Sequence, residues 1–254
     1  MFSVVALPAA LAHLSPRLVS ATSLAGEAAR PEHPSLPFGF DELDQLLPDG
    51  GLLRGGVVEL SIAGKSGLGT TLALGAVRAL QQQRSQSFGS REKPWCAFVD
   101  PSGSLYAPGV AASGVALERL LVVRPSVEAL SRVALKLAES GVFELVIVDM
   151  LGVLGHSLEL SLGRFGRVVR RLSMAVDGTD KCVLLLTDAE EPRALPLPVA
   201  QRIELVRPTA ERLLVRVAKD RRGRVSSQRP LAWTRGSRVH DLENAEEGHV
   251  QRLA

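Results

Sequence analysis

The stretch Gly64–Thr71, GKSGLGTT, restricts what this chain can fold into more than any other feature. It has the outline of a phosphate-binding loop, G-x-x-x-x-G-K-[ST]. In such a loop the backbone N–H groups cradle phosphates, the lysine reaches the outer phosphates and the last hydroxyl holds Mg²⁺. Here Thr70 stands in the lysine's position and Thr71 keeps the hydroxyl. The motif predicts a phosphate loop that has lost its main charge.

The flanking sequences decide between a phosphate loop and an ordinary glycine-rich turn. Residues 56–62 are mostly apolar and predict a short buried strand before the loop. Leu72, Leu74, Val77 and Leu80 predict a helix with an apolar stripe after it. Because the motif requires a strand, a glycine loop and a helix in this order, we interpret it as a degenerate phosphate loop.

The rest of the chain alternates strands with helices. Predicted strands cover residues 57–62, 95–100, 120–124, 145–149, 183–187, 202–206 and 213–218, and predicted helices cover 70–83, 127–140 and 162–176. This alternation predicts an α/β fold with a mostly parallel sheet covered by helices on both faces. Residues 36–233 form the predicted core domain. Residues 1–35 are expected to be a helix and a proline-bearing linker, and residues 234–254 an acidic, disordered tail.

Composition excludes several classes of protein. The chain has 254 residues and no apolar run of 18, so no membrane span is expected. Its apolar first residues lack a basic region, which argues against a signal peptide and favours a cytoplasmic protein. Cys96 and Cys182 lie in apolar runs with no second Cys or His at ligand spacing. We expect buried, inert thiols and no metal site.

A second nucleotide-site element follows the loop along the chain. Residues 145–149, LVIVD, are four apolar residues and an acid at the end of a predicted strand. This is the pattern of a Walker B strand, whose carboxylate faces the Mg²⁺ beside the phosphate loop. Any buried strand can end in Asp, but Asp149 gains weight from the loop before it.

From Phe38 to Trp233 the chain resembles the RecA recombinase family, on three segments. FGFDELDQLLPDGGLLRGGVVEL resembles the lead into the family's phosphate loop, AFVDPSGSLYAPGVAASGVALERLLVVRP the run with its catalytic glutamate, and LVIVDMLGVL its Walker B strand. Within the family, the overall character is most similar to the ImuA-type accessory proteins of translesion DNA synthesis. The resemblance implies a RecA-like core with a central sheet.

Carried over by position, the resemblance implies that the catalytic groups are mostly lost. Thr70 replaces the loop lysine, Ser102 stands where the glutamate activates water, and Asp188 stands where a glutamine senses the outer phosphate. Only Asp149 remains of the charged set. Without lysine and glutamate, several kcal/mol of transition-state stabilisation are missing, so we expect no ATP hydrolysis.

The degenerate nucleotide site would comprise Gly64, Lys65, Ser66, Gly67, Gly69, Thr70, Thr71 and Asp149. We expect no bound cofactor at this site. Weak binding of ATP and Mg²⁺ stays open as an alternative. Lys65 carries the alternative, because some deviant phosphate loops use a lysine at this position. Those loops also keep the usual lysine, so rescue by Lys65 is the less favoured interpretation.

Two basic segments are candidates for DNA or partner binding. Residues 162–176 place most of Arg164, Arg167, Arg170 and Arg171 along one helix face, which a solvated surface explains equally well. Between Arg202 and Arg238 stand eleven Arg or Lys and three acids. The densest cluster there contains Lys219, Arg221, Arg222 and Arg224. Such a cluster suits a phosphate backbone or a protein partner.

The resemblance implies a non-catalytic accessory protein of the DNA damage response, supporting error-prone translesion synthesis. Its expected partners are RecA, an ImuB-type protein similar to Y-family polymerases and, indirectly, a DnaE-type polymerase. Two alternatives stay open. One is a DNA-dependent ATPase that uses Lys65, and the other is a non-specific DNA-binding protein that uses the basic segments.

Overall fold

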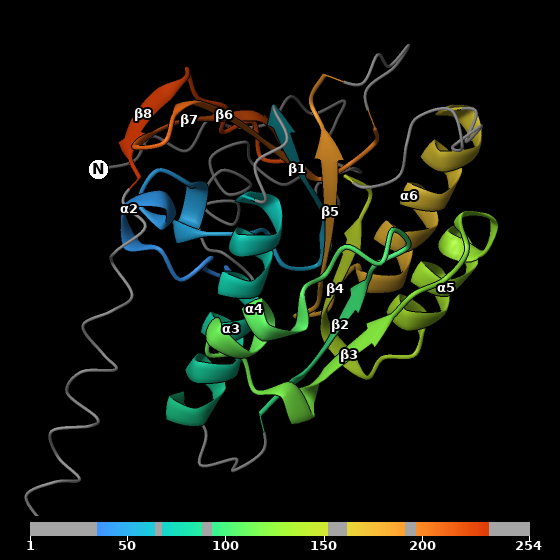
Figure 1. The fold of residues 1–254 in the computed structure, drawn as a ribbon. Coiled ribbons are helices and arrows are strands. Elements are labelled where there is room, and N and C mark those ends of the chain that lie inside the picture. The colour runs from blue at the N-terminus through green and yellow to red at the C-terminus, as the bar shows by residue number, and fades with distance from the viewer. Residues whose placement is uncertain (1–34, 64–67, 88–92, 152–161, 191–196, 234–254) are drawn as a thin grey trace, which may run out of the picture. The chain divides into compact units, whose positions relative to one another are not determined.

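The computed structural model describes residues 35–63, 68–87, 93–151, 162–190 and 197–233, which all lie in the compact unit His33–Ala254. In these residues eight strands form one sheet in the order β3-β2-β4-β5-β1-β6-β7-β8 (Figure 1). The strands are β1 (Gly56–Ala63), β2 (Trp95–Val99), β3 (Leu120–Val123), β4 (Phe143–Asp149), β5 (Cys182–Asp188), β6 (Gln201–Thr209), β7 (Arg212–Asp220) and β8 (Arg229–Ala232).

The sheet is parallel from β3 to β6, and β7 and β8 add to it in antiparallel pairs. The helices are α2 (Asp41–Asp44), α3 (Leu68–Ser87), α4 (Ala107–Ala112), α5 (Val127–Glu139) and α6 (Leu162–Val176). The predicted α/β fold with a mostly parallel sheet is confirmed.

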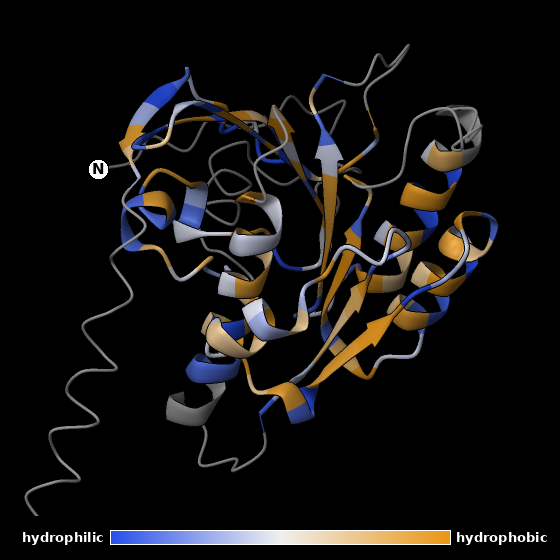
Figure 2. Ribbon diagram, in the orientation of Figure 1, coloured by the Kyte–Doolittle hydropathy of each residue, from blue (hydrophilic) through white to orange (hydrophobic). Residues whose placement is uncertain are grey.

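Two apolar clusters form the core, one on each face of the sheet. On one face, α3, α4 and residues 36–53 pack on strand residues such as Val58 and Leu60. On the other, α5 and α6 pack on alternate residues such as Val57 and Val183. The central strands are hydrophobic along almost their whole length (Figure 2), as expected for parallel strands covered on both sides.

All seven predicted strands and all three predicted helices are present, with ends shifted by a few residues. The predicted helix 70–83 is longer in the structure, where α3 runs from Leu68 to Ser87. Sequence reasoning missed α2, α4 and β8, which are four, six and four residues long. Such short elements show too little periodicity, and β8 contains Pro230, which is tolerated because it is an edge strand.

The predicted N-terminal helix with its linker, and the predicted acidic tail, lie outside the described residues. No helix of the described part has the length and apolar character needed to cross a membrane. Cys96 and Cys182 are buried and unpaired with each other, and burial raises the pKa of each thiol to about 12.

Candidate nucleotide site and basic surfaces

The strand and the helix predicted on either side of the glycine motif are present. β1 ends at Ala63 and α3 begins at Leu68, while Gly64, Lys65, Ser66 and Gly67 lie outside the described residues. Thr70 and Thr71 lie in the first turn of α3 and are partly exposed. The threonine that replaces the lysine is therefore at the helix start, where a lysine would reach toward phosphates.

Close packing explains the glycine at position 69. A Cβ there would lie 2.6 Å from Ile62 Cδ1, at the end of β1, and 2.8 Å from Leu151 Cδ1, beyond β4. The first turn of α3 therefore packs directly on the end of β1 and on the residue that follows β4 by two positions. Only a glycine, which has no Cβ, permits this close approach without a shift of its neighbours.

Three acidic side chains lie at the carboxyl edge of the sheet, beside the loop. Asp149 and Asp188 end β4 and β5, and Asp100 directly follows β2. Each occupies a strand position whose side chain alternates onto the α3 face, as the neighbouring core residues Ile147, Leu186 and Phe98 do. The alternation therefore places all three carboxyl groups on the α3 side of the sheet.

Asp149 is the predicted Mg²⁺-side carboxylate and is buried. Its Oδ1 accepts a hydrogen bond from the Leu151 N–H at 3.0 Å. Burial raises the pKa of Asp149 above its ordinary value; the Leu151 N–H opposes this effect and the negative charge of Asp100 adds to it. A carboxyl group in this environment gains from a bound cation, which would favour its ionised form.

Asp100 organises the loop that carries Ser102, where the resemblance implies a glutamate. Its Oδ1 accepts from the Ser104 N–H at 3.0 Å and its Oδ2 from the Leu105 N–H at 3.1 Å. Arg124, after β3, donates from Nε to Asp100 Oδ2 at 3.2 Å. Ser102 Oγ donates to Asp100 Oδ1 at 3.2 Å and lies 2.9 Å from Ser104 Oγ. Ser102 thus takes part in the turn, and its hydroxyl is too weak a base to activate water.

Asp188 lies beside the end of β1. In the parallel register it pairs with Ile62, and the next residue, Ala189, donates its N–H to the Ile62 carbonyl at 2.9 Å. Asp188 Oδ1 accepts from the Glu190 N–H at 2.8 Å. If an outer phosphate binds beside the end of β1, as the resemblance implies, the negative charge of Asp188 opposes triphosphate binding there.

The described residues fit Mg²⁺–ATP only in part. Asp149 and Thr71 could serve the metal side, and a cation would relieve the burial of Asp149. On the predicted phosphate side, Thr70 offers a hydroxyl and Asp188 an acid, where the resemblance implies a cation and a neutral amide. Ser102 offers no general base. Among the described residues, no group of three or more His, Cys, Asp or Glu is placed to hold a metal ion.

The α6 arginines lie on the outer surface, over the neighbouring helix α5. Arg167, Arg170 and Arg171 are exposed, and the side chain of Arg164 lies outside the described residues. Arg171 Nη2 contacts Glu139 Oε1 of α5 at 3.2 Å, with both side chains at least half exposed. Exposed ion pairs of this kind contribute little stability. The outer face of α6 still carries the exposed Arg167 and Arg170 and is therefore basic.

The cluster around the end of β7 is largely engaged inside the molecule. Arg222 and Arg224 both pair with Asp49, and Arg224 also pairs with Asp220. Arg221 Nη1 donates to the Gly55 carbonyl at 3.1 Å, while Lys219 is exposed on β7. The sequence showed the density of positive charge, but the acid that faces it lies more than 170 residues away along the chain.

A buried charged group that sequence reasoning missed lies in the middle of the sheet. Glu59 of β1 accepts from Arg202 Nε at 2.7 Å and from Thr187 Oγ1 at 2.9 Å. Glu59 is fully buried and Arg202 is mostly buried. An acid inside an otherwise apolar strand was the available signal, because a buried charge requires a partner.

The second missed feature is an apolar surface at the free edge of the sheet. β3 is the outermost strand and is hydrophobic along its length (Figure 2). Val122 of β3 is 40% exposed and Tyr106, before α4, is 71% exposed. Beside them is a hollow of about 460 Å³ lined by Leu105, Ala107, Val110, Leu117, Leu120, Val122 and Arg124.

Comparison with known families agrees with this architecture. The family model described as the RecA N-terminal domain matches residues 12–173, which is more than half of the chain. The chain belongs to the RecA N-terminal domain family. The predicted RecA-like character is thereby confirmed at the level of the family.

Individual relatives carry the name RecA. The chain is 28% identical over 179 residues to Protein RecA of Oceanobacillus iheyensis and to Protein RecA of Bacillus subtilis. Each alignment covers 65% of this chain and 48% of the relative. Protein RecA of Kineococcus radiotolerans is 32% identical over 136 residues, or 53% of this chain and 36% of the relative. The chain spans about half the length of the curated relatives it matches.

Proposed function

We propose that this chain is a non-catalytic RecA-like accessory protein of the DNA damage (SOS) response. In this role it supports error-prone translesion synthesis by contacting RecA and an ImuB-type polymerase-like partner in the cytoplasm, and a DnaE-type polymerase acts indirectly. The observation that carries the proposal is the site at the carboxyl edge of the sheet. The RecA-like framework is kept there, while the residues that would do the chemistry are replaced.

Three replacements support a pseudo-ATPase, a domain with the ATPase fold but without turnover. Thr70, in the first turn of α3, carries no positive charge, and Ser102 is hydrogen-bonded into the loop that Asp100 organises. Asp188 puts a carboxylate beside the end of β1. Phosphoryl transfer depends on positioning and on stabilising negative charge, so these changes act on the same step.

The apolar edge around β3 supports the protein-binding half of the proposal. An edge strand has unpaired backbone groups on one side, and natural proteins usually protect such edges with charge or with a covering segment. β3 instead presents Leu121 and Val122, both about 40% exposed, beside the apolar hollow. A surface with these properties suits a partner that adds an extended segment to the sheet.

The alternative function is a DNA-dependent ATPase that uses Lys65. The retained Thr71 and Asp149 favour it, because both belong to the Mg²⁺ side of a working site. A third function, non-specific DNA binding, is favoured by the exposed Arg167 and Arg170 of α6. The pairing of Arg222 and Arg224 with Asp49 weighs against the other basic cluster as it stands.

A binding measurement without nucleotide tests the accessory role. Purified protein is titrated with purified RecA and with an ImuB-type partner by sedimentation velocity, with and without ATP and Mg²⁺. The proposal predicts complexes whose affinity does not change on adding nucleotide to this protein's degenerate site; a non-hydrolysing RecA variant separates the effect of RecA's own nucleotide. Absence of both complexes would contradict the accessory role.

A further inference from the structure

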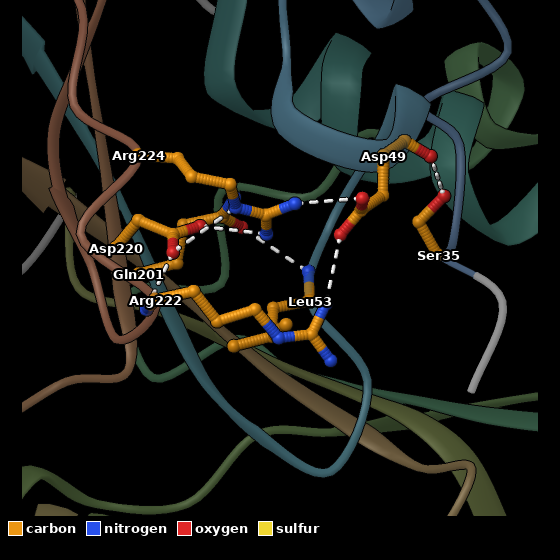
Figure 3. Close-up of polar contacts among 7 residues, drawn as sticks. All are labelled: Ser35, Asp49, Leu53, Gln201, Asp220, Arg222 and Arg224. Carbon is orange, nitrogen blue, oxygen red and sulfur yellow. Dashed lines mark hydrogen bonds and ion pairs between the residues drawn. The ribbon is translucent and has the colours of Figure 1, made fainter. Parts of the chain in front are cut away.

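A compact cluster of charges joins two segments that are far apart in the sequence. Asp49 lies in the turn that precedes β1, and Arg222 and Arg224 lie in the turn that follows β7. Asp220, the last residue of β7, completes the group (Figure 3). We call these four residues the Asp49 clamp.

The two arginines converge on the two oxygens of one carboxylate. Arg224 Nη1 lies 2.6 Å from Asp49 Oδ1, and Arg222 Nη1 lies 3.1 Å from Asp49 Oδ2. Figure 3 shows both guanidinium groups directed toward Asp49. Arg224 also donates from Nη2 to Asp220 Oδ2 at 3.1 Å. The clamp therefore contains two cations and two anions and has no net charge.

The clamp changes the electrostatics of the basic segment from what its sequence suggests. The hydrogen bond from Arg224 lowers the pKa of Asp49, and Asp49 is the first cause of a raised pKa for Arg224. Both groups are therefore held in their charged forms across the physiological pH range. The two arginines carry charge, but an ion approaching from outside meets the compensating carboxylates as well.

The ion pairs of the Asp49 clamp are partly exposed, so that an anion from solution can compete with Asp49 for the two arginines. The side chains of Arg222, Asp49 and Arg224 are 19%, 24% and 34% exposed. Partly exposed ion pairs are screened by salt and contribute little net stability. The turns on both sides contain glycines with positive φ, Gly50 and Gly223, and a Cβ at either would meet nothing within 4 Å. The turns therefore have space around them and backbones that tolerate rearrangement.

We propose that Arg222 and Arg224 form a binding site for the phosphates of single-stranded nucleic acid. Asp49 occupies this site in the free protein and competes with the phosphates for the two arginines. Paired guanidinium groups that close on two oxygens of one anion match the geometry of a phosphate. Lys219, the residue before Asp220, is exposed and adds a further positive charge on β7, while Arg221 donates to the Gly55 carbonyl. This inference does not rest on the accessory role or on loss of ATPase activity.

The test removes the competitor's charge and keeps its backbone. Asp49 has a left-handed conformation, with φ of 57°, and asparagine is among the residues that adopt it most readily. Asp49→Asn is therefore compared with the wild-type full chain for binding of labelled oligo-dT across a salt series. The matched control is Glu204→Gln, which frees Arg216 from an exposed pair between β6 and β7 without touching the clamp.

The proposal predicts tighter binding by Asp49→Asn at low salt, with a slope of log K against log salt steeper by about 0.7 for each phosphate newly contacted. Adding Arg222→Gln and Arg224→Gln to Asp49→Asn should remove the gain, and Glu204→Gln should not reproduce it. Equal binding by wild type and Asp49→Asn would overturn the proposal, as would a gain that survives loss of both arginines.

A second variant and a second ligand complete the experiment. If circular dichroism shows that Asp49→Asn has lost its fold, Asp49→Gly is used, because glycine adopts positive φ without strain. Polyglutamate replaces oligo-dT in a parallel titration. A gain in affinity for polyglutamate without a gain for oligo-dT would show that the site takes acidic protein segments, and the nucleic-acid proposal would then be wrong.

Discussion

At the scale of single residues, the buried pair of Glu59 and Arg202 should matter far more than any surface pair. Replacing Arg202 with Gln removes the guanidinium that lies 2.7 Å from the fully buried carboxylate of Glu59. Breaking such a pair costs about 3–5 kcal/mol, whereas an exposed pair is worth at most about 1 kcal/mol. Urea unfolding of Arg202→Gln should show a loss of this size.

Glu204→Gln is the control for this prediction, because it breaks the exposed pair with Arg216 on the same two-stranded ribbon. It should unfold close to wild type. A similar, small loss of unfolding free energy in both variants would contradict the prediction. It would mean that the hydrogen bond from Thr187 and other contacts are enough to accommodate the charge of Glu59.

Asp44 gives the molecule a specific dependence on pH. Burial, opposed by hydrogen bonds from the amides of Phe38, Gly39 and Phe40, raises the pKa of Asp44 from 3.8 to about 6. Because the folded state binds this proton more tightly than the unfolded state, Asp44 adds stability below pH 3.8 that is lost as the pH rises through about 6.

Asp44→Asn should lack this component. Chemical unfolding between pH 4 and pH 7 should therefore show a shallower fall in stability with rising pH for the variant than for wild type. A carboxyl resonance of Asp44 that titrates near its ordinary value in NMR would contradict the burial argument.

At the scale of elements, two helical glycines should respond in opposite directions to alanine. In α3, a Cβ at Gly75 would lie 2.5 Å from the Phe38 carbonyl oxygen and 2.5 Å from Phe40 Cε2. In α6, a Cβ at Gly166 would meet only Pro198 Cδ, at 3.9 Å. Gly75→Ala should lose about 1–3 kcal/mol through overpacking, and Gly166→Ala should gain about 0.5–1 kcal/mol from helix propensity.

Thermal and urea unfolding of the two variants measures both effects. The comparison tests whether residues 36–40 pack directly on α3, as the apolar cluster of that face implies. Stabilisation by both alanines would place this segment farther from the helix than the structure does.

The elements themselves were largely predictable from the sequence, and their side-chain partners were not. Apolar runs such as residues 145–149 and 183–187 are long and uniform enough to predict buried strands. Gln81 shows the limit, because it begins a polar run yet is buried. It donates from Nε2 to the Ala116 carbonyl and accepts from the Ala116 N–H at 2.8 Å. A contact across 35 residues has no signature in local periodicity.

The position of the acidic side chains at the strand ends was predictable for a different reason. Asp100, Asp149 and Asp188 each follow an apolar strand, and parallel strands bring their carboxyl ends to one edge. The contacts of the neighbouring residues could be found only from the three-dimensional structure. Asp100 hydrogen-bonds the loop of Ser102, and Asp49 neutralises arginines that the sequence shows only as a basic cluster.

At the scale of the whole molecule, the apolar edge of the sheet should be where a protein partner binds. Val122→Lys places a charge on the exposed edge strand without filling the core, because Val122 is 40% exposed. It should weaken binding to RecA or to the ImuB-type partner at least tenfold, about 1.4 kcal/mol, with unchanged unfolding. Met174→Lys, at an apolar position of α6 that is 78% exposed, is the control.

Equal loss of binding in both variants would point to a general effect of added charge, and loss in Met174→Lys alone would move the interface to the α6 face. Either result would remove the edge of the sheet from the account of partner binding.

The most direct test of the central claim is ATP binding and hydrolysis by the purified protein, with and without single-stranded DNA, beside a Lys65→Ala variant. The proposed loss of the lysine at position 70 and of the base at position 102 predicts no turnover above background under any of these conditions. Turnover that is stimulated by DNA and abolished by Lys65→Ala would show that the loop has moved its lysine, and would contradict the account.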